Sequence, residues 1–557
     1  MSGSAPSIGD GEGCFLDEKN RPTDRVRTMK EGMKILVCDG LEKAGLDILR
    51  AAELSIDARP DLSHDELVRL IPGYSGLIVR SKSSVDRDVI AAADRLRVIG
   101  RAGTGVDNID VSAATRRGII VMNAAEGNTI TTAEHTFAML MALARQVPQA
   151  TSSLRQGKWE KKRFIGVELM GKTLGVIGLG RIGRAVAHRA SCFGMAVIGY
   201  DPYFTKEAAS KVGIELINLE DLFAAADFIS VHTPLTDETR GIINSASIEK
   251  MKPGVRIINC ARGGLVDENA LAAAVRSGRV AGAALDVFDQ EPVAPDNPLL
   301  AIDQVILTPH LGASTEEAQV GVATILAEQF VDYFKRGAIR GAVNAPSVTA
   351  ETLAAIGPYI ALGEKLGLFQ GSVFGHDIRE VHLEYSGEVA EQDTSPITQA
   401  VLAGLLSPVI ERVNMVNARL VADERGIKVT ESLSRKARDF ASLVNVRAVT
   451  AAGESQVAGA LMGRTDARIV RINGFSLEAI PKGHMLFILN NDVPGVLGRI
   501  ATFIGDLHIN IGRLYLGRKK IGENALALIQ IDQPLSPDDL AGLSSLREVV
   551  SVQQVKL

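Results

Sequence analysis

The sequence predicts an α/β protein with several domains, built on parallel sheets for about its first two-thirds and α+β thereafter. From residue 34 to about residue 346, short β-branched runs alternate with helical stretches, which is the pattern of parallel βαβ units. With 557 residues the chain is too long for one core, and roughly three to four domains are expected. The last segment has the order βαββαβ, which predicts a ferredoxin-like unit.

The composition is that of an ordinary globular protein, with 46% hydrophobic and 23% charged residues. A net charge of −5 gives no basic surface for nucleic acid, and the apolar run at 136–144 is too short to span a membrane. Cys14, Cys38, Cys192 and Cys260 have no disulfide or zinc spacing. We therefore expect a cytoplasmic protein with no metal site and with neither nucleic acid nor membrane as a partner.

The expected elements follow in order. Residues 1–33 lack an apolar signal segment and are expected to form a flexible leader or an over-extended start, since MKILVCDGL at 33–41 begins like a first strand. KILVCDG, GLIVRS, LRVIGRAG and IIVMNA are the first strands, and a long helix ends this series. KTLGVIGLG, AVIGYD, FISVHTP, RIINCA, AGAALDVF and VILTPH form a second series. These runs are almost continuously apolar, as expected when helices cover both faces of a sheet.

The strand–turn–helix GVIGLGRIG carries the nucleotide-binding pattern Gly178-x-Gly180-x-x-Gly183. The glycines allow a tight turn and close approach of the backbone to a pyrophosphate at the helix N-terminus. Asp201 ends the next strand, where its carboxylate accepts hydrogen bonds from ribose hydroxyls and repels a 2′-phosphate. This pattern favours NAD over NADP. The alternative is a glycine-rich turn that binds no nucleotide.

Polar residues stand at the carboxyl ends of several strands of the second series: Thr233, Arg262, Asp286 and His310, with Glu291 shortly after Asp286. Ligands bind at this edge of an open parallel sheet. An arginine fork for a carboxylate, a histidine base and a carboxylate that orients the histidine suit oxidation of a 2-hydroxy acid. Each residue alone is also compatible with an ordinary surface turn, and it is their joint placement that predicts catalysis.

GLGRIG, INCARGGLVDENAL, ALDVFDQEP and TPHLGASTEEAQ closely resemble the D-isomer-specific 2-hydroxyacid dehydrogenases. GRAGTGVDNIDV and WEKKRFIGVEL are similar to the branch of that family that oxidises D-3-phosphoglycerate to 3-phosphohydroxypyruvate, the first step of serine biosynthesis. The resemblance covers residues 34–346 and implies a Rossmann-like domain inserted in a flavodoxin-like substrate domain. The implied segments are a substrate domain at 34–130, an NAD-binding domain at 131–321, a return segment at 322–346, an intervening domain at 347–480 and an ACT domain at 481–557.

The resemblance also implies roles, carried over by motif. The catalytic residues would be Arg262, Glu291 and His310. The residues near NAD would be Thr104, Gly178, Gly180, Arg181, Ile182, Gly183, Asp201, Thr233, Ala261, Asp286 and Gly312. The residues that bind substrate carboxylate and phosphate would be Arg80, Ser81, Gly103 and Gly105.

Four basic residues, Lys158, Lys161, Lys162 and Arg163, form a cluster with two interpretations. Such clusters are commonly solvated faces. The resemblance makes this one a phosphate contact, reaching the site of a neighbouring subunit. Both interpretations stay open.

The last third carries no catalytic motif. NMVNARLVADERGI resembles the intervening domain of the long members of the branch, and NNDVPGVLGRIATFIGDLHINI resembles an ACT domain, a module that binds amino acids. The resemblance implies an allosteric homo-oligomer, dimer or tetramer, with L-serine as its effector at Asn490, Asp492 and Asn510. The alternative is a module that only assembles subunits.

Two other functions remain open from the sequence. One is a sister dehydrogenase acting on glycerate, hydroxypyruvate or lactate, although these usually end near residue 346. The other is an NAD-sensing co-repressor, which the intact Arg262, Glu291 and His310 do not exclude.

Overall fold

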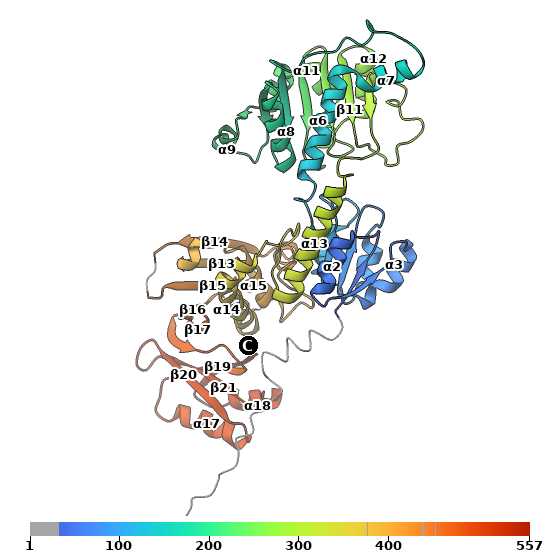
Figure 1. Ribbon diagram of the computed structural model, residues 1–557. Helices are drawn as coiled ribbons and strands as arrows, with labels where there is room; N and C mark the ends of the chain where they lie inside the picture. The colour runs from blue at the N-terminus through green and yellow to red at the C-terminus, as the bar shows by residue number, and fades with distance from the viewer. Residues whose placement is uncertain (1–32, 376, 437–438, 452) are drawn as a thin grey trace, which may run out of the picture.

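The computed structural model describes residues 33–375, 377–436, 439–451 and 453–557, whose strands form four sheets of five, seven, six and four strands (Figure 1). The leader predicted for residues 1–33 lies outside these ranges except for its last residue. The two parallel sheets and the two α+β units that follow them confirm the predicted fold class.

The first sheet has the strand order β2-β1-β3-β4-β5 with all strands parallel, which is the flavodoxin-like order. Its helices begin at strong N-caps: Ser63 and Glu66 form a capping box before α3, and Asp86 and Asp110 cap α4 and α5. The elements are β1 (Lys34–Val37), α2 (Lys43–Ala51), β2 (Ser55–Ala58), α3 (His64–Leu70), β3 (Gly76–Val79), α4 (Arg87–Ala92), β4 (Val98–Arg101), α5 (Val111–Arg116) and β5 (Ile120–Asn123).

The second sheet is also parallel and has the order β8-β7-β6-β9-β10-β11-β12, which is the Rossmann order with one added strand. The strand order reverses between β6 and β9, so a ligand is expected at the carboxyl ends of these two strands. The elements are β6 (Thr173–Ile177), α8 (Arg181–Cys192), β7 (Ala196–Tyr200), α9 (Lys206–Lys211), β8 (Glu215–Leu216), α10 (Leu219–Ala225), β9 (Phe228–Val231), α11 (Ser245–Lys250), β10 (Val255–Asn259), α12 (Glu268–Arg276), β11 (Val280–Leu285) and β12 (Val305–Leu307).

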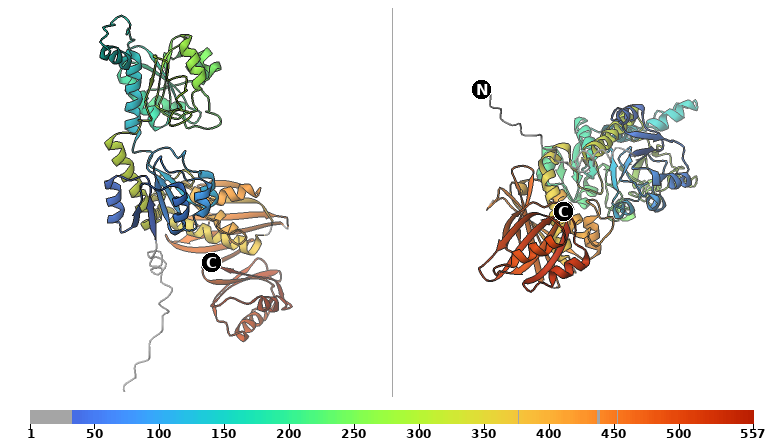
Figure 2. Two further views of the ribbon diagram at one scale, coloured as in Figure 1. Left: turned by 90° about the vertical axis from the view of Figure 1, so that its right-hand side faces the viewer. Right: turned by 90° about the horizontal axis from the view of Figure 1, so that it is seen from below.

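Two long helices, α6 (Thr129–Arg145) and α13 (Glu316–Arg336), join these two domains (Figures 1 and 2). α6 packs against β10, β11 and α8 in the nucleotide domain, and α13 returns the chain to pack against α2 in the substrate domain. α7 (Val147–Arg155) follows α6 at the far end of the nucleotide domain. The nucleotide domain is therefore inserted in the substrate domain, as the resemblance implied. The predicted boundary after residue 321 falls inside α13.

The third sheet, β14-β13-β15-β16-β17-β18, is antiparallel except for the β13–β14 pair. The helices α14 and α15 lie beside this sheet and pack closely against each other. A Cβ on Gly367 of α14 would overlap the carbonyl oxygen of Val401 of α15. The elements are α14 (Ala350–Phe374), β13 (Ile378–Gly387), α15 (Ser395–Leu406), α16 (Ala418–Glu424), β14 (Lys428–Ser434), β15 (Ser442–Thr450), β16 (Gly453–Met462), β17 (Asp466–Ile472) and β18 (Phe475–Ala479). This unit docks on the substrate domain through Asn414 Nδ2, which donates to Gly118 O at 2.9 Å, and Asn417 Nδ2, which donates to Arg116 O at 3.1 Å.

The last unit has the order β20-β21-β19-β22, with every pair antiparallel and two helices in the βαββαβ sequence. This is the ferredoxin-like topology that the sequence predicts. The elements are β19 (His484–Asn491), α17 (Val496–Asp506), β20 (Ile511–Arg518), β21 (Asn524–Ile531), α18 (Pro537–Ser544) and β22 (Val549–Lys556).

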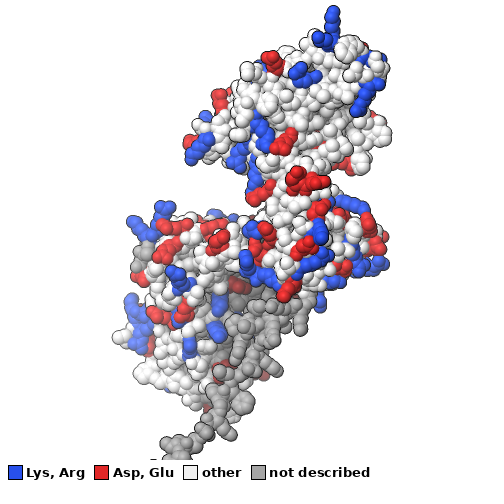
Figure 3. All heavy atoms as spheres, viewed as in Figure 1, with Lys and Arg blue, Asp and Glu red and all other residues white. Residues whose placement is uncertain are grey.

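None of the helices in the described ranges is long and apolar enough to cross a membrane. On the face drawn in Figure 3, acidic and basic side chains are interspersed over both the nucleotide domain and the lower domains.

Candidate active site

The glycine-rich turn lies at the carboxyl end of β6, where the strand order reverses. Gly178 has φ +94°, and a Cβ there would press against the backbone of His232. A Cβ on Gly183 would overlap the carbonyl oxygen of Gly178, so α8 can begin this close to the strand only with glycine. Around Gly180, by contrast, no atom of the described part of the chain lies within 4 Å of the Cβ position. The turn is packed tightly on the protein side and open where a pyrophosphate would lie.

Asp201 and Thr233 flank this turn and fit a dinucleotide. Asp201 Oδ2 accepts the amide hydrogen of Leu179 at 2.8 Å, and its Oδ1 accepts that of Tyr203 at 2.9 Å. A carboxylate has about four acceptor positions, so two remain for ribose hydroxyls. The hydroxyl of Thr233 is buried and has no hydrogen-bond partner among the described residues, although it lines the cleft. A buried orphan hydroxyl of this kind is expected to bind a ligand.

A cavity of about 450 Å³ separates the substrate and nucleotide domains at these strand ends. Its wall brings together residues of both domains that the sequence predicts to be functional: Thr104, Gly105, Ile182, Thr233, Ala261, Arg262, His310 and Gly312. The other predicted residues of the two domains do not line this cavity: Arg80, Ser81, Gly103, Gly178, Gly180, Arg181, Gly183, Asp201, Asp286 and Glu291. Among them, Arg181 Nη2 forms an ion pair with Glu126 at 3.1 Å.

Arg262 occupies the turn after β10. Asn259, at the end of that strand, holds the turn by accepting the amide hydrogen of Ala261 at 3.0 Å and donating to Arg262 O at 2.8 Å. A Cβ on Gly263 would overlap the carbonyl oxygen of Phe288, and Gly264 has φ +77°. The two glycines after Arg262 are therefore required by close packing and by backbone conformation. The guanidinium faces the cleft.

His310 and Glu291 form a hydrogen-bonded pair at the edge of the cleft. His310 Nδ1 lies 2.6 Å from Glu291 Oε2, and Glu291 Oε1 accepts the amide hydrogen of Phe288 at 3.1 Å. The hydrogen bond to Glu291 raises the pKa of His310 above its usual value, and partial burial opposes it. For Glu291, partial burial raises the pKa, but the hydrogen bonds from His310 and Phe288 outweigh it and the pKa is lowered. Glu291 is therefore a carboxylate that stabilises an imidazolium.

His232 also follows a strand end, but its environment differs. Its Nε2 lies 2.8 Å from Ser230 Oγ, and burial lowers the pKa of His232 to about 4. It stays neutral at physiological pH, and among the described residues it has no carboxylate partner of the kind that His310 has.

Asp286 lies directly beneath His310 and is fully buried. Its Oδ1 accepts hydrogen bonds from Thr308 Oγ1 at 2.6 Å and from the amide of Leu311 at 2.7 Å, and its Oδ2 accepts from the amide of Gly312 at 2.8 Å. Burial alone raises the pKa of Asp286, but hydrogen bonds led by that of His135 outweigh it, and the pKa lies below the usual value. In this structure Asp286 holds the turn that carries His310, and its contact with NAD stays a prediction.

Two charged residues that interact with Arg262 were missed from the sequence. Arg101, at the end of β4, is largely buried; burial, together with the nearby Arg262 and Arg80, lowers its pKa. Its Nε has no hydrogen-bond partner among the described residues. Arg101 stands at a strand end as Arg262 does, so the same argument could have selected it from the sequence. A Cβ on Gly103, whose φ is +156°, would overlap the Arg101 guanidinium.

Asp107 is the second residue missed. Its Oδ2 lies 3.0 Å from Arg262 Nε, so this ion pair connects the substrate domain to the nucleotide domain across the cleft. Asp107 has a side chain that is 69% exposed, and a Cβ on the neighbouring Gly105 would overlap Arg262 Nη2. Aspartates are common in surface loops, so nothing in the sequence distinguishes Asp107 from any other solvated aspartate.

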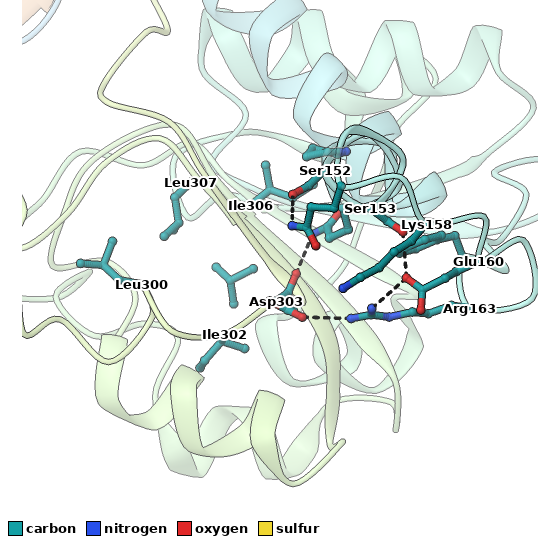
Figure 4. A pocket seen from close by; sticks show the side chains of 15 residues that line it. Ser152, Ser153, Lys158, Glu160, Arg163, Leu300, Ile302, Asp303, Ile306 and Leu307 are labelled. Carbon is teal, nitrogen blue, oxygen red and sulfur yellow. Dashed lines mark hydrogen bonds and ion pairs between the residues drawn. The ribbon is translucent and has the colours of Figure 1, made fainter.

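Figure 4 shows Lys158 and Arg163 of the basic cluster at the wall of a cavity whose lining residues differ from those of the cleft. Lys158 and Arg163 line a separate cavity of about 500 Å³ between α7 and the chain around β12. Arg163 forms ion pairs with Glu160 at 3.3 Å and Asp303 at 3.2 Å, so its charge is compensated within the chain. None of the four basic residues lines the cleft of its own chain.

The three residues predicted to be regulatory lie in the ferredoxin-like unit. Asp492 follows β19, is only 13% exposed and forms an ion pair with Arg518 at 2.7 Å. Asn490 is buried, and its Oδ1 has no partner among the described residues. Asn510 precedes β20 while Arg518 ends it, so Asn510 and Asp492 lie at opposite ends of this strand. A single copy of the unit therefore does not bring all three together.

Two family models match the chain. The model of the D-isomer specific 2-hydroxyacid dehydrogenase NAD binding domain matches residues 137–312, and that of the D-3-phosphoglycerate dehydrogenase intervening domain matches residues 355–473. The first match covers the glycine-rich turn, Arg262, Glu291 and His310, and identifies NAD as the cofactor of this domain.

The relatives extend this likeness over almost the full length. The D-3-phosphoglycerate dehydrogenase of Archaeoglobus fulgidus is 43% identical over 94% of this chain and 100% of its own. The chain belongs to the D-3-phosphoglycerate dehydrogenase family. The D-3-phosphoglycerate dehydrogenase of Bacillus subtilis is 41% identical over 94% of this chain and 99% of its own. The enzyme of the same name from Rattus norvegicus is 46% identical over 72% of this chain and 75% of its own.

Solved structures resemble part of this member of the D-3-phosphoglycerate dehydrogenase family. The TT0316 protein of Thermus thermophilus matches with a TM-score of 0.51 and 36% identity, over 56% of this chain and 100% of that one. A glyoxylate reductase from Paecilomyes thermophila matches with a TM-score of 0.52 and 29% identity, over 56% and 98%. Both likenesses support the predicted dehydrogenase fold.

Proposed function

We propose that this protein oxidises D-3-phosphoglycerate to 3-phosphohydroxypyruvate with NAD, the first step of serine biosynthesis. The observation that supports the proposal is that Arg262 lines the cleft together with His310, the partner of Glu291, while Arg80 and Arg101 stand at the ends of two neighbouring strands of the substrate domain. Guanidinium groups are positively charged, and neighbouring like charges repel one another. A substrate with a carboxylate at one end and a phosphate at the other would compensate them.

The geometry supports the following catalytic roles. The planar guanidinium of Arg262 binds the substrate carboxylate through two parallel hydrogen bonds, which fixes the C2 hydroxyl beside His310. His310 Nδ1 is engaged by Glu291, so its Nε2 is the atom that accepts the hydroxyl proton. Glu291 stays ionised and stabilises the imidazolium that forms. Bound NAD supplies the hydride acceptor.

The phosphate is assigned to the substrate-domain side of the cleft. Arg80 follows β3 and Arg101 ends the neighbouring strand β4, and the carboxyl ends of these two strands meet at one edge of the sheet. Ser81 and the backbone amides of Gly103 and Gly105 lie in the same two loops and provide further donors. The unpartnered Nε of Arg101 is a donor that a phosphate oxygen would satisfy.

NADH formation with D-3-phosphoglycerate, D-glycerate and D-lactate tests the proposal, with His310→Asn as the inactive control. Turnover of D-3-phosphoglycerate with the highest kcat/KM is expected. A higher kcat/KM for D-glycerate or D-lactate would identify a sister dehydrogenase. NAD binding without turnover of any of the three would favour a co-repressor.

We also propose that the chain assembles as a homo-oligomer through the face around α7. Large apolar side chains are exposed there, including Leu154 at 58%, Trp159 at 84% and Ile165 at 76%. Patches of this kind mark association surfaces. The test is the molar mass of Trp159→Lys by light scattering, with Tyr203→Lys as the control. Tyr203 is 95% exposed and follows β7, toward the opposite edge of the seven-stranded sheet from β12. Only Trp159→Lys is expected to reduce the molar mass, and equal masses for both variants would contradict the proposal.

We propose further that the ferredoxin-like unit is an ACT domain that binds L-serine as an inhibitor. Asp492 and the unpartnered Asn490 Oδ1 offer acceptors for the ammonium group, and Arg518 offers a partner for the carboxylate. Asn510 at the far end of β20 would contribute from a second copy across a two-fold interface. Calorimetry is expected to detect L-serine but not D-serine, with binding lost in Asp492→Ala. No heat and no inhibition at millimolar L-serine would leave the unit a structural one.

A cytoplasmic location is part of the same proposal. NAD-linked biosynthesis and the unpaired Cys38, Cys192 and Cys260 suit a reducing compartment. Cell fractionation tests it, and recovery of the protein outside the cytoplasm would contradict it.

A further inference from the structure

The turn that carries His310 is held from below by a buried negative charge. His310 itself has φ +53°, a left-handed conformation that is unfavourable for a residue other than glycine. The two residues after it donate their amide hydrogens to the Asp286 carboxylate, and the amide of His310 donates to the Asp286 carbonyl oxygen at 2.9 Å. The position of the imidazole therefore depends on the position of Asp286.

A second histidine reaches the same carboxylate from a different element. His135 lies in the middle of α6, and its Nε2 is 3.1 Å from Asp286 Oδ1 and 3.3 Å from Thr308 Oγ1. Its side chain is 19% exposed, and that of Asp286 is completely buried. The polar contact thus lies between α6 and the strand ends beneath the catalytic turn.

The hydrogen-bond pattern fixes which atom carries the proton. Asp286 has a lowered pKa and is a carboxylate, so it only accepts hydrogen bonds. The single hydroxyl proton of Thr308 is already donated to Asp286 Oδ1 at 2.6 Å. His135 Nε2 must therefore carry a hydrogen, which points at Asp286 Oδ1. Removing it would leave a buried carboxylate short of one donor.

We propose that His135 is a positioning residue, which acts through Asp286 to hold the turn 308–312 in the conformation that places His310 against Glu291. This rests on the proposed function, because it assigns His310 as the base. His135 does not line the cleft, so its proposed effect is on the geometry of the base. A misplacement of a catalytic group by about 1 Å can cost roughly hundredfold in rate.

The test replaces His135 by glutamine and by asparagine, two amide side chains that differ only in length. The amide nitrogen of glutamine falls close to the position of histidine Nε2, whereas that of asparagine falls close to Nδ1. His135→Gln is therefore expected to stay within about threefold of the wild-type kcat, which is small beside the hundredfold scale of misplacement. His135→Asn and His135→Leu are expected to lose roughly tenfold to hundredfold in kcat. KM for NAD should change little in all three, and the exposed His188→Leu on α8 is the matched control.

Two further measurements keep the outcome decisive. Thr308→Val removes the other side-chain donor to Asp286 Oδ1 and is expected to lower kcat in the same way, which covers the case of a poorly folded His135 variant. Melting temperatures of all variants separate misfolding from misplacement. Equal kcat values for His135→Gln and His135→Asn, or full activity in His135→Leu, would overturn the role of His135. Absence of turnover in the wild type would instead overturn the proposed function.

Discussion

The Nδ1 atom of His310 lies 2.6 Å from Oε2 of Glu291, and this contact sets both the orientation and the basicity of the imidazole. The hydrogen bond raises the pKa of His310, so the protonated form is more stable here than in water. A base must be neutral to accept a proton, and the rate of oxidation should therefore fall as the pH decreases through this pKa.

Glu291→Gln is expected to move the acid limb of the kcat/KM profile to lower pH. The amide carries no negative charge, so the imidazolium is less favoured and the pKa of His310 decreases. kcat should decrease at the same time, because a neutral partner stabilises the imidazolium less. The measurement is kcat/KM against pH for the wild type, Glu291→Gln and the exposed-site control Glu317→Gln. An unmoved acid limb would exclude this pairing as the origin of the pH dependence.

Arg262→Lys is expected to damage substrate use and leave NAD binding nearly unchanged. The ammonium group cannot reproduce a planar bidentate contact, and a hydrogen bond between charged groups contributes about 1.5–3 kcal/mol. The expected loss in kcat/KM for the hydroxy acid is therefore roughly tenfold to hundredfold. Steady-state kinetics together with fluorescence titration of NAD separate the two effects. Wild-type kcat/KM in this variant would rule out Arg262 as the carboxylate ligand.

Asp201→Ser is expected to narrow the preference for NAD over NADP. The carboxylate that binds ribose hydroxyls and repels a 2′-phosphate is removed, while the short hydroxyl still accepts an amide hydrogen. The ratio of kcat/KM for the two cofactors should decrease by at least about tenfold, which corresponds to about 1.4 kcal/mol. Asp296→Ser, an exposed aspartate in a loop, is the control. If both variants discriminate as the wild type does, Asp201 does not face the ribose.

Arg80→Gln and Arg101→Lys are expected to weaken use of the phosphorylated substrate more than that of D-glycerate. Both arginines are assigned to the phosphate, which D-glycerate lacks, so its kcat/KM should change little. Arg95→Gln removes a charge from an exposed position of the same domain and serves as the control. Equal losses for both substrates would place these arginines elsewhere than at the phosphate.

Much of this fold could be predicted from local patterns. Continuous apolar strands indicate parallel sheets, and Gly178, Gly180 and Gly183 are needed wherever a strand, a turn and a helix approach so closely. The course of α13 could not be predicted, because one amphipathic pattern runs through all of Glu316–Arg336 and does not show where the helix leaves one domain for the other.

The site divides in the same way. Arg262 and His310 follow strand ends, and the parallel topology brings these ends to one edge of the sheet. Arg101 also stands at a strand end, although it was not selected from the sequence. His135 could not be found, since a histidine within a helix gives no sign of which distant carboxylate it faces. The ion pair between Asp107 and Arg262 also depends on how the two domains approach.

The central claim is that the cleft binds a hydroxy acid through its carboxylate and its phosphate at once. The most direct test is the ratio of the wild-type kcat/KM for D-3-phosphoglycerate to that for D-glycerate, measured with saturating NAD. Two charge-assisted hydrogen bonds to the phosphate, at about 1.5 kcal/mol each, predict a ratio of at least about a hundred. A ratio near one would contradict the account.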